Sequence, residues 1–282
     1  MKNLKMFCLS LEPSHYEFVK KLGYIPVGLG KKDFSKSWFT DKSGANISEK
    51  NKYYGEYTFH YWLWKNYLDS NFDDENSWIG FCQYRKFWST RSDNLLPNSI
   101  DELKPLILTE IPKLYDDYDV ILGDPYFINQ LKIMKFLKHG FKLIAKNPSC
   151  LFDKNKRNIK FHFDLMHGNK NLDKAIELLE GDDRNDFNEF VNSRTYFNPQ
   201  NMFICKSKKI LKNYYSTLFP WLERCEKLFG FENLRGYGKI RIYGFLAERF
   251  MSYWFQKNTK SKIMPIVFYD IRKNIKKDVL FL

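Results

Sequence analysis

Three groups of residues in this sequence have side chains that could do chemistry. One sets Glu56 among tyrosines and tryptophans, one is the run from Gln83 to Lys86, and one pairs Glu248 with Arg249 in an apolar segment. A carboxylate among apolar neighbours has to be hydrogen-bonded or paired when it is buried. Carboxylates bind hydroxyls or move protons, and paired cations bind phosphates. These groups therefore indicate a polar ligand that carries phosphate.

Glu56 lies near the start of a segment, residues 52–69, that has helical periodicity. One side of this segment carries, at helical spacing, Tyr54, Tyr57, Tyr61 and Trp64, which is typical of a helix that packs into the core. Core packing is therefore one interpretation of these aromatic residues. Glu56 differs from them, because a carboxylate near the helix start is placed to receive a sugar hydroxyl.

The run from Gln83 to Lys86 follows the apolar stretch 78–81, which we predict to be a strand. Ligands bind at the carboxyl edge of open α/β sheets, so this run is placed for binding. Arg85 and Lys86 have aromatic neighbours, a combination that can hold a diphosphate and stack a ring. The alternative is a solvated basic loop.

Glu248 stands in the middle of an apolar segment, residues 241–254. Partial desolvation would raise the pKa of its carboxyl group, as a general base requires. The alternative is a structural ion pair with Arg249.

The remaining acidic and histidine residues give weaker signals. Residues 117–119 match the DxD pattern of divalent-ion sites, but they precede a predicted strand and so lie at the edge away from ligands. We interpret them as a turn. His162, Asp164 and His167 form a weak ligand cluster, and His167 is also placed to touch a substrate. We predict no metal site from them.

Strand-like and helix-like segments alternate, which predicts a single α/β domain with a mixed, mostly parallel central sheet flanked by helices. The expected strands are 5–11, 24–27, 78–81, 120–122, 202–205 and 263–269. The expected helices are 52–69, 99–115, 128–146, 171–180, 184–192, 208–229 and 242–257.

Composition limits the class of protein. The 282 residues are 44% hydrophobic and 18% aromatic, which excludes disorder for most of the chain. The net charge of +13 indicates an anionic partner or surface. Five scattered cysteines without CxxC spacing predict buried free thiols in a reducing cytoplasm. We expect no membrane span and no signal peptide, because the apolar runs are too short.

The motifs also resemble those of a known family. The matching positions are Thr40-Asp41, Gly44, Asn46-Ile47-Ser48, Asn51, Tyr54, Glu56, Thr58, Tyr61-Trp62, Trp64-Lys65-Asn66, Ile79 to Phe87, Asn201 to Ile204 and Gly244 to Phe250. In these the sequence resembles a bacterial family of capsular-polysaccharide and O-antigen glycosyltransferases that long carried a domain-of-unknown-function label. The resemblance covers nearly the whole chain.

The resemblance implies a GT-A-like fold and transfer of a sugar onto a growing surface glycan. Some members transfer galactosyl or galactofuranosyl groups, so a UDP-linked hexose is the default nucleotide-sugar donor. It implies a transferase domain over residues 1–268, with a donor part in about 1–125 and an acceptor side in about 126–268.

Each candidate residue then has an expected role. The donor pocket is expected to contain Asp41, Asn51, Tyr54 and Glu56, with Tyr84, Arg85 and Lys86 at the diphosphate. Glu248 is the expected general base of an inverting displacement, and His167 and Asn201 are expected to contact the glycan or lipid-linked glycan acceptor.

One departure concerns the metal. The family usually has His-Tyr-Arg-Arg where this chain has the run from Gln83 to Lys86, at the place where related enzymes bind a metal ion. The histidine is missing and two cations remain. We therefore expect protein cations to neutralise the diphosphate, with Mn²⁺ or Mg²⁺ as the alternative.

The carboxyl-terminal residues 269–282 form a basic amphipathic tail, with Ile271, Ile275 and Val279 on one helical face. Such a tail suits the anionic cytoplasmic face of the inner membrane, where a lipid-linked acceptor would lie. The alternative is a closing helix packed on the core.

Two other classes of protein fit parts of the sequence. A nucleic-acid-binding protein would fit the charge, but the basic residues are scattered and no RNA- or DNA-binding motif appears, so we expect no nucleic-acid partner. A non-catalytic carbohydrate-binding module would use the same aromatic residues, but it would not need the Arg85–Lys86 pair.

Overall fold

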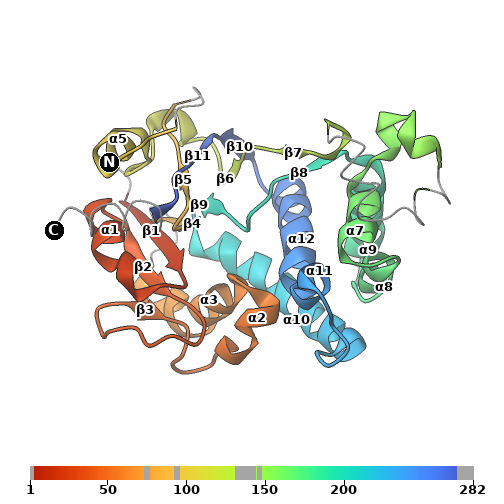
Figure 1. The fold of residues 1–282 in the computed structure, drawn as a ribbon, viewed down its shortest axis with the longest axis horizontal. Coiled ribbons are helices and arrows are strands. Elements are labelled where there is room, and N and C mark those ends of the chain that lie inside the picture. The colour runs from red at the N-terminus through yellow and green to blue at the C-terminus, as the bar shows by residue number, and fades with distance from the viewer. Residues whose placement is uncertain (1–2, 73–76, 92–95, 131–143, 145–147, 272–282) are drawn as a thin grey trace.

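The structure is a computed structural model that describes residues 3–72, 77–91, 96–130, 144 and 148–271 (Figure 1). In this part of the chain one sheet of nine strands forms the centre, with the order β10-β6-β9-β4-β1-β2-β3 and with β5 joining β4 to β11. Its strands are β1 (Asn3–Ser10), β2 (Ile25–Gly28), β3 (Phe39–Thr40), β4 (Ser77–Gln83), β5 (Lys86–Trp88), β6 (Val120–Gly123), β9 (Phe203–Cys205), β10 (Ser261–Met264) and β11 (Ile266–Phe268).

The sheet is mixed and mostly parallel, as the sequence predicts. β1 runs parallel to both β2 and β4, and β6 runs parallel to β10. β9 lies antiparallel between β4 and β6. Because of this reversal, the chain enters β9 at the edge where the parallel strands end.

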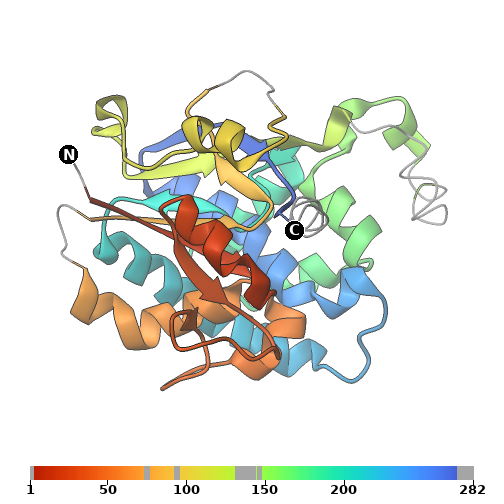
Figure 2. The ribbon, with the colours of Figure 1, turned by 60° about the vertical axis from the view of Figure 1, so that its left-hand side comes forward.

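Helices cover both faces of the sheet, and β1 shows why. Phe7 and Leu9 point into a core that includes residues of α3, α10 and α12, whereas Met6 and Cys8 point into a second core that includes α1 and α5. In Figure 2 the segment around α5 lies above the sheet and α2 to α4 lie below it. The helices are α1 (Tyr16–Lys21), α2 (Asn51–Tyr54), α3 (Tyr57–Trp62), α4 (Leu68–Asn71), α5 (Ile100–Leu103), α7 (Ile159–His167), α8 (Asn171–Ile176), α9 (Asp183–Ser193), α10 (Lys208–Phe229), α11 (Tyr237–Ile240) and α12 (Ile242–Asn258).

The segment between β6 and β9 leaves and re-enters the sheet at neighbouring strands. It contains a small two-stranded sheet, β7 (Tyr126–Phe127) with β8 (Tyr196–Phe197), and the helices α7, α8 and α9. These helices lie on the right in Figure 1, and α12 packs against α7 and α9.

Most predicted elements are present, and the helices 208–229 and 242–257 are confirmed almost to the residue. The predicted helix 52–69 is interrupted at Gly55 and continues as α3, a π-helical turn (Leu63–Tyr67) and α4. The predicted helix 99–115 is split, as its two prolines favour: only α5 is α-helical, and Pro105 and Pro112 leave short 3-10 turns beyond it. The prediction missed α1, α7 and the short α11.

Some predictions fall on residues outside the described part. Most of the expected helix 128–146 and residues 272–282 of the basic tail belong to this group. All five cysteines are free and buried, as predicted. Among the described residues, no helix is both long and apolar enough to cross a bilayer.

Candidate active site

A cleft lies at the carboxyl ends of β1, β2 and β4, where the sequence places the run that begins at Gln83. Its enclosed part measures about 90 Å³. The residues around it come from the strand ends, the β4–β5 turn, α2 and the residue before α12: Leu9, Ser10, Leu11, Leu29, Asn51, Gly55, Glu56, Gln83, Tyr84, Arg85 and Arg241. The described part of the chain thus brings Asn51, Glu56, Tyr84 and Arg85 together, as expected for one pocket.

Glu56 is the one carboxylate among these lining residues. Its Oε1 accepts a hydrogen bond from Gln83 Nε2 at 3.1 Å, and its Oε2 forms an ion pair with Arg241 Nη2 at 3.0 Å. Asn201 Nδ2 lies 3.4 Å from the same Oε2. Three donors from three distant segments therefore fix the orientation of this carboxylate at the cleft.

Gly55 makes this arrangement possible. Its φ of 60° lies in the left-handed region, where glycine is favoured. A Cβ atom at this position would lie 2.2 Å from Arg241 Nη2. The break between α2 and α3 thus places Glu56 at the cleft and leaves room for the guanidinium of Arg241.

Gln83 uses its side-chain amide as a hydrogen-bond donor in this site. Besides Glu56, Gln83 Nε2 contacts the carbonyl oxygen of Gln200 at 2.9 Å. Gln83 pairs with Lys86 across the tight β4–β5 hairpin. The turn of this hairpin consists of Tyr84 and Arg85, and the Arg85 guanidinium lies 5.0 Å from the centre of the Tyr84 ring.

Lys86 lies just inside the hairpin. Burial lowers the pKa of its ammonium group, while the nearby carboxylates of Glu248 and Glu56 raise it and Arg85 lowers it further. Lys86 thus interacts electrostatically with both candidate carboxylates of the site, Glu248 and Glu56.

Asp41 is completely buried next to this region. Burial raises the pKa of its carboxyl group, and the neighbouring Thr58 and Lys42 only partly offset the effect. Neither carboxylate oxygen has a hydrogen-bond partner within normal distance in the described part of the chain. Thr58 also accepts a hydrogen bond from Asn51 Nδ2 at 3.1 Å, which places Asp41 behind the Asn51 wall of the cleft.

The turn before β9 has an unusual backbone. Gln200 and Asn201 both have positive φ angles, 81° and 55°, although neither is glycine. Such conformations cost free energy and persist where the surroundings enforce them. Asn201 is 7% exposed, and its Oδ1 has no partner among the described residues.

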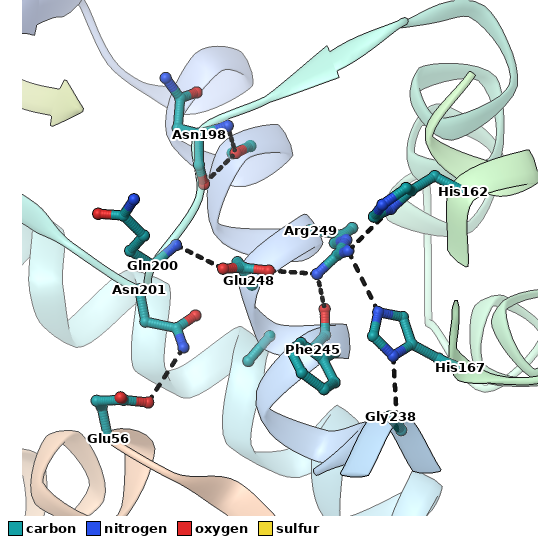
Figure 3. A network of polar contacts seen from close by, with 12 residues as sticks. Glu56, His162, His167, Asn198, Gln200, Asn201, Gly238, Phe245, Glu248 and Arg249 are labelled. Carbon is teal, nitrogen blue, oxygen red and sulfur yellow. Dashed lines mark hydrogen bonds and ion pairs between the residues drawn. The ribbon is translucent and has the colours of Figure 1, made fainter. Parts of the chain in front are cut away.

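Helix α12 holds this turn in place (Figure 3). Glu248 Oε1 accepts a hydrogen bond from the Gln200 backbone N–H, and Ser252 Oγ accepts one from the Asn198 N–H at 2.7 Å. The two anchors are four residues apart and therefore lie on the same face of the helix.

Glu248 also forms an ion pair with the buried Arg249 (Figure 3). Arg249 Nη2 lies 3.3 Å from His162 Nδ1 and 3.3 Å from His167 Nε2. The other nitrogen of His167, Nδ1, lies 3.0 Å from the Gly238 carbonyl oxygen. Burial and the Arg249 charge lower the pKa of His167, so the neutral ring donates to Gly238 and accepts from Arg249.

Other predicted residues lie elsewhere. Tyr54 does not line the cleft, because its hydroxyl donates to Glu226 Oε2 at 2.8 Å on the far side of α2. In the DxD pattern, Asp119 accepts a hydrogen bond from the Lys260 N–H at 2.9 Å, at the amino end of β6. Within the described residues there is no cluster of three or more His, Cys, Asp or Glu side chains arranged for a metal ion.

Arg241 is the residue at the cleft that sequence analysis missed. Its signal in the sequence was its place directly before the apolar helix that carries Glu248. That signal did not identify it, because its partner Glu56 is 185 residues away.

Comparison with known proteins identifies the family. Residues 12–259 match the family described as Domain of unknown function (DUF4422). The chain belongs to this family. No curated protein matches the chain.

The fold is also that of a solved glycosyltransferase. The chain is similar to the apo structure of the bifunctional glycosyltransferase WbbM, with a TM-score of 0.57 and 18% sequence identity. The similarity covers 94% of this chain and 45% of the WbbM chain, so this DUF4422 chain spans less than half of that protein's length. At this identity the likeness concerns the fold.

Proposed function

We propose that this protein is a glycosyltransferase that moves a hexose from a UDP-sugar onto a growing capsular polysaccharide or lipopolysaccharide glycan. The observation that carries the proposal is the cleft at the sheet edge, where the fixed carboxylate of Glu56 lies beside Arg85 and Arg241. A carboxylate suits sugar hydroxyls and guanidinium groups suit a diphosphate. The fold shared with a glycosyltransferase supports this assignment.

The donor would occupy the cleft, with Asn51 at its inner wall, Asp41 buried behind Asn51, and Arg85, Lys86 and Arg241 around the diphosphate. Small-molecule sites usually enclose about 300–1,000 Å³. The enclosed part of this cleft is smaller, so the donor extends over its open rim. Arg241 then shares its guanidinium between Glu56 and the phosphates.

The acceptor would approach from the turn at Gln200 and Asn201. Glu248 takes the proton of the acceptor hydroxyl, whose oxygen attacks the anomeric carbon as the bond to the diphosphate breaks, with inversion. Each carboxylate oxygen has two lone pairs, so Glu248 can accept a hydrogen bond from this hydroxyl while it keeps its hydrogen bonds with the Gln200 N–H and with Arg249. Asn201 would orient a sugar hydroxyl through its Oδ1, which is buried and has no hydrogen-bond partner among the described residues, once the acceptor has displaced the atoms that cover it. His167 has both ring nitrogens engaged within the protein, so we assign it to holding Arg249.

The leaving diphosphate would be neutralised by protein cations. Arg85, Lys86 and Arg241 supply three positive charges, and the Gln83 amide is already used as a donor to Glu56. Preorganised charges of this kind stabilise the transition state without a metal ion. We therefore expect transfer to continue in EDTA, and strict dependence on Mn²⁺ or Mg²⁺ would refute this part.

The acceptor is proposed to wait at the cytoplasmic face of the inner membrane, where the basic tail binds anionic lipid. Deletion of residues 272–282, which spares the buried Asp270 and Ile271, should abolish binding to liposomes that contain phosphatidylglycerol. Unchanged binding would remove the tail from lipid binding.

The first test is a thermal-shift panel of nucleotides and nucleotide sugars, with and without EDTA. A ligand at about 100 times its Kd stabilises the native state by roughly 2.7 kcal/mol. Selective stabilisation by UDP or a UDP-sugar supports the donor class. A non-catalytic carbohydrate-binding module should ignore the nucleotide, so no shift with any nucleotide would favour that alternative.

A further inference from the structure

A second cavity lies on the other side of α2 from the cleft and measures about 390 Å³. Helix α10 forms its opposite wall, and the π-helical turn Leu63–Tyr67 forms a third side. π-Helical turns are rare and occur frequently at functional sites. The volume falls in the range of small-molecule sites, about 300–1,000 Å³.

Aromatic side chains form one wall of the cavity. The Trp64 ring stacks on Phe219, with centroids 5.5 Å apart and planes at 12°. Tyr61 meets the same Phe219 edge-on, at 5.1 Å and 89°. Phe219 is buried, whereas Tyr61 and Trp64 are half-buried and line the cavity. This packing holds the two half-buried rings in fixed positions at the surface.

Carboxylates form the facing wall. Glu226 is held by Lys50 Nζ at 2.6 Å and by the Tyr54 hydroxyl at 2.8 Å, so its orientation is fixed. Glu223, one turn earlier on α10, is exposed and pairs with Lys227 at 3.2 Å. The cavity therefore combines a rigid aromatic wall with a rigid carboxylate and a more mobile one.

Lys65 also lines this cavity, but it contacts an aromatic ring and forms no ion pair among the described residues. Its ammonium group is 3.6 Å from the centre of the Trp64 ring. Within the described residues it forms no ion pair, whereas Lys50 and Lys227 are both paired with glutamates. Among the described residues that line the cavity, Lys65 is thus the one lysine without an ion pair, and it lies beside two carboxylates, which does not suit a phosphate group.

We propose that this cavity binds a saccharide residue of a glycan, separately from the donor cleft. A sugar ring has an apolar C–H face, which packs on Tyr61, because Phe219 and Lys65 already cover the two faces of the Trp64 ring. Its hydroxyl groups donate to Glu226 and Glu223. Sites of this type combine an apolar wall with a few fixed polar groups. Lys65 adds a contact for sugars that carry a carboxylate.

Helix α2 separates the two cavities. Asn51 lines the donor cleft and Tyr54, three residues later, lines the saccharide cavity. Binding of a saccharide in this cavity therefore requires neither the donor nor catalysis, and it can be measured when both are absent.

The test is saturation-transfer NMR on the full chain with galactose, glucose, mannose, N-acetylglucosamine and galacturonate, each at about 50 mM, since affinities near 1 mM correspond to only about −4 kcal/mol. We expect at least one sugar to bind. Tyr61→Ala should weaken its binding by about tenfold, which is about 1.4 kcal/mol. Glu223→Gln should weaken it as well, and Lys65→Met should reduce any preference for galacturonate.

Phe152→Ala is the matched control, because this aromatic side chain is 89% exposed and lies far along the chain from the cavity. It should leave sugar binding unchanged. Absence of binding by all five sugars, or binding that survives both Tyr61→Ala and Glu223→Gln, would overturn the proposal. The thermal shift with UDP should be the same in Tyr61→Ala as in the parent, so failure here is distinguishable from failure of the transferase proposal.

Discussion

Arg241 Nη2 and Glu56 Oε2 lie 3.0 Å apart and join the start of α12 to the start of α3. The two residues are 185 positions apart in the sequence. Both side chains keep part of their surface exposed at the cleft, 26% for Arg241 and 19% for Glu56. The pair is therefore within reach of a ligand, and a bound diphosphate would compete with Glu56 for the guanidinium.

Replacement of Arg241 by alanine should weaken UDP binding by about tenfold or more, because the diphosphate loses a charge-assisted contact. Turnover should fall too, since Glu56 loses a partner. Titration calorimetry with UDP measures the effect. Arg235→Ala is the control, because Arg235 is exposed and its hydrogen bonds within the described part of the chain go to carbonyl oxygens of its own loop. Equal affinities in the two variants would remove Arg241 from the donor site.

Replacement of Arg85 by alanine should lower donor affinity and turnover together. Arg85 lies in the β4–β5 turn at the cleft and packs on Tyr84, so its loss removes charge without disturbing the sheet. Calorimetry and initial rates on the same preparation provide the two values. An unchanged affinity for UDP would contradict the phosphate role.

Replacement of Glu248 by glutamine should cut turnover by roughly 10²–10⁴ while donor affinity stays nearly constant. The variant should also be less stable, by about 3–5 kcal/mol, because the buried Arg249 loses its counter-charge. Rates should therefore be measured at a temperature where both proteins are folded.

Ser252→Ala distinguishes the two roles of Glu248. Ser252 anchors the same 198–201 turn from the same face of α12 but has no carboxylate. If both variants slow transfer equally, Glu248 only positions the turn. A much larger loss in Glu248→Gln supports proton transfer.

Replacement of Asp41 by asparagine should make the free protein more stable at neutral pH. Burial raises the pKa of Asp41 in the native state above its unfolded value of about 3.9. The unmodified protein therefore loses stability as the pH rises through the native pKa, because the buried carboxyl group must then ionise. The gain in melting temperature should be small near pH 4 and larger near pH 8. If the gain in melting temperature does not grow with pH, ionisation of Asp41 in the native state does not lower the stability of the protein.

The same variant should bind UDP-sugar less well, because Asp41 is completely buried behind Asn51 and the change alters the support of this wall of the cleft. Lys42→Met is the control, because it removes a charge at the residue next to Asp41 and leaves the Asp41 carboxyl group unchanged. If donor affinity is equal in the parent and Asp41→Asn, Asp41 does not support the donor site.

Sequence patterns were sufficient where local signals decide the structure. α10 and α12 were predicted because long apolar periodicity leaves one choice, and β1, β4 and β6 because their apolar runs are too short for buried helices. The position of the run from Gln83 to Lys86 followed from strand direction. These features depend on neighbours within a few residues.

The missed features depend on distant residues. The helix break at Gly55 leaves room for the side chain of Arg241. The approach of Asn201 to Glu56 depends on the antiparallel direction of β9 relative to the neighbouring strands. A single sequence does not reveal either partner. For Glu248 the sequence left an ion pair and a general base open. The ion pair with Arg249 is present, and the base role stays a prediction.

The path of the chain between β6 and β9 has an evolutionary consequence. Because the segment that carries α7, α8 and α9 starts and ends at paired strands, a longer or shorter version needs no change in sheet register. The entropic cost of closing such a loop grows only slowly with its length. We expect family members to diverge most in the length of this segment, while the cleft residues of β1, α2 and β4 and the α7 histidines that hold Arg249 stay alike.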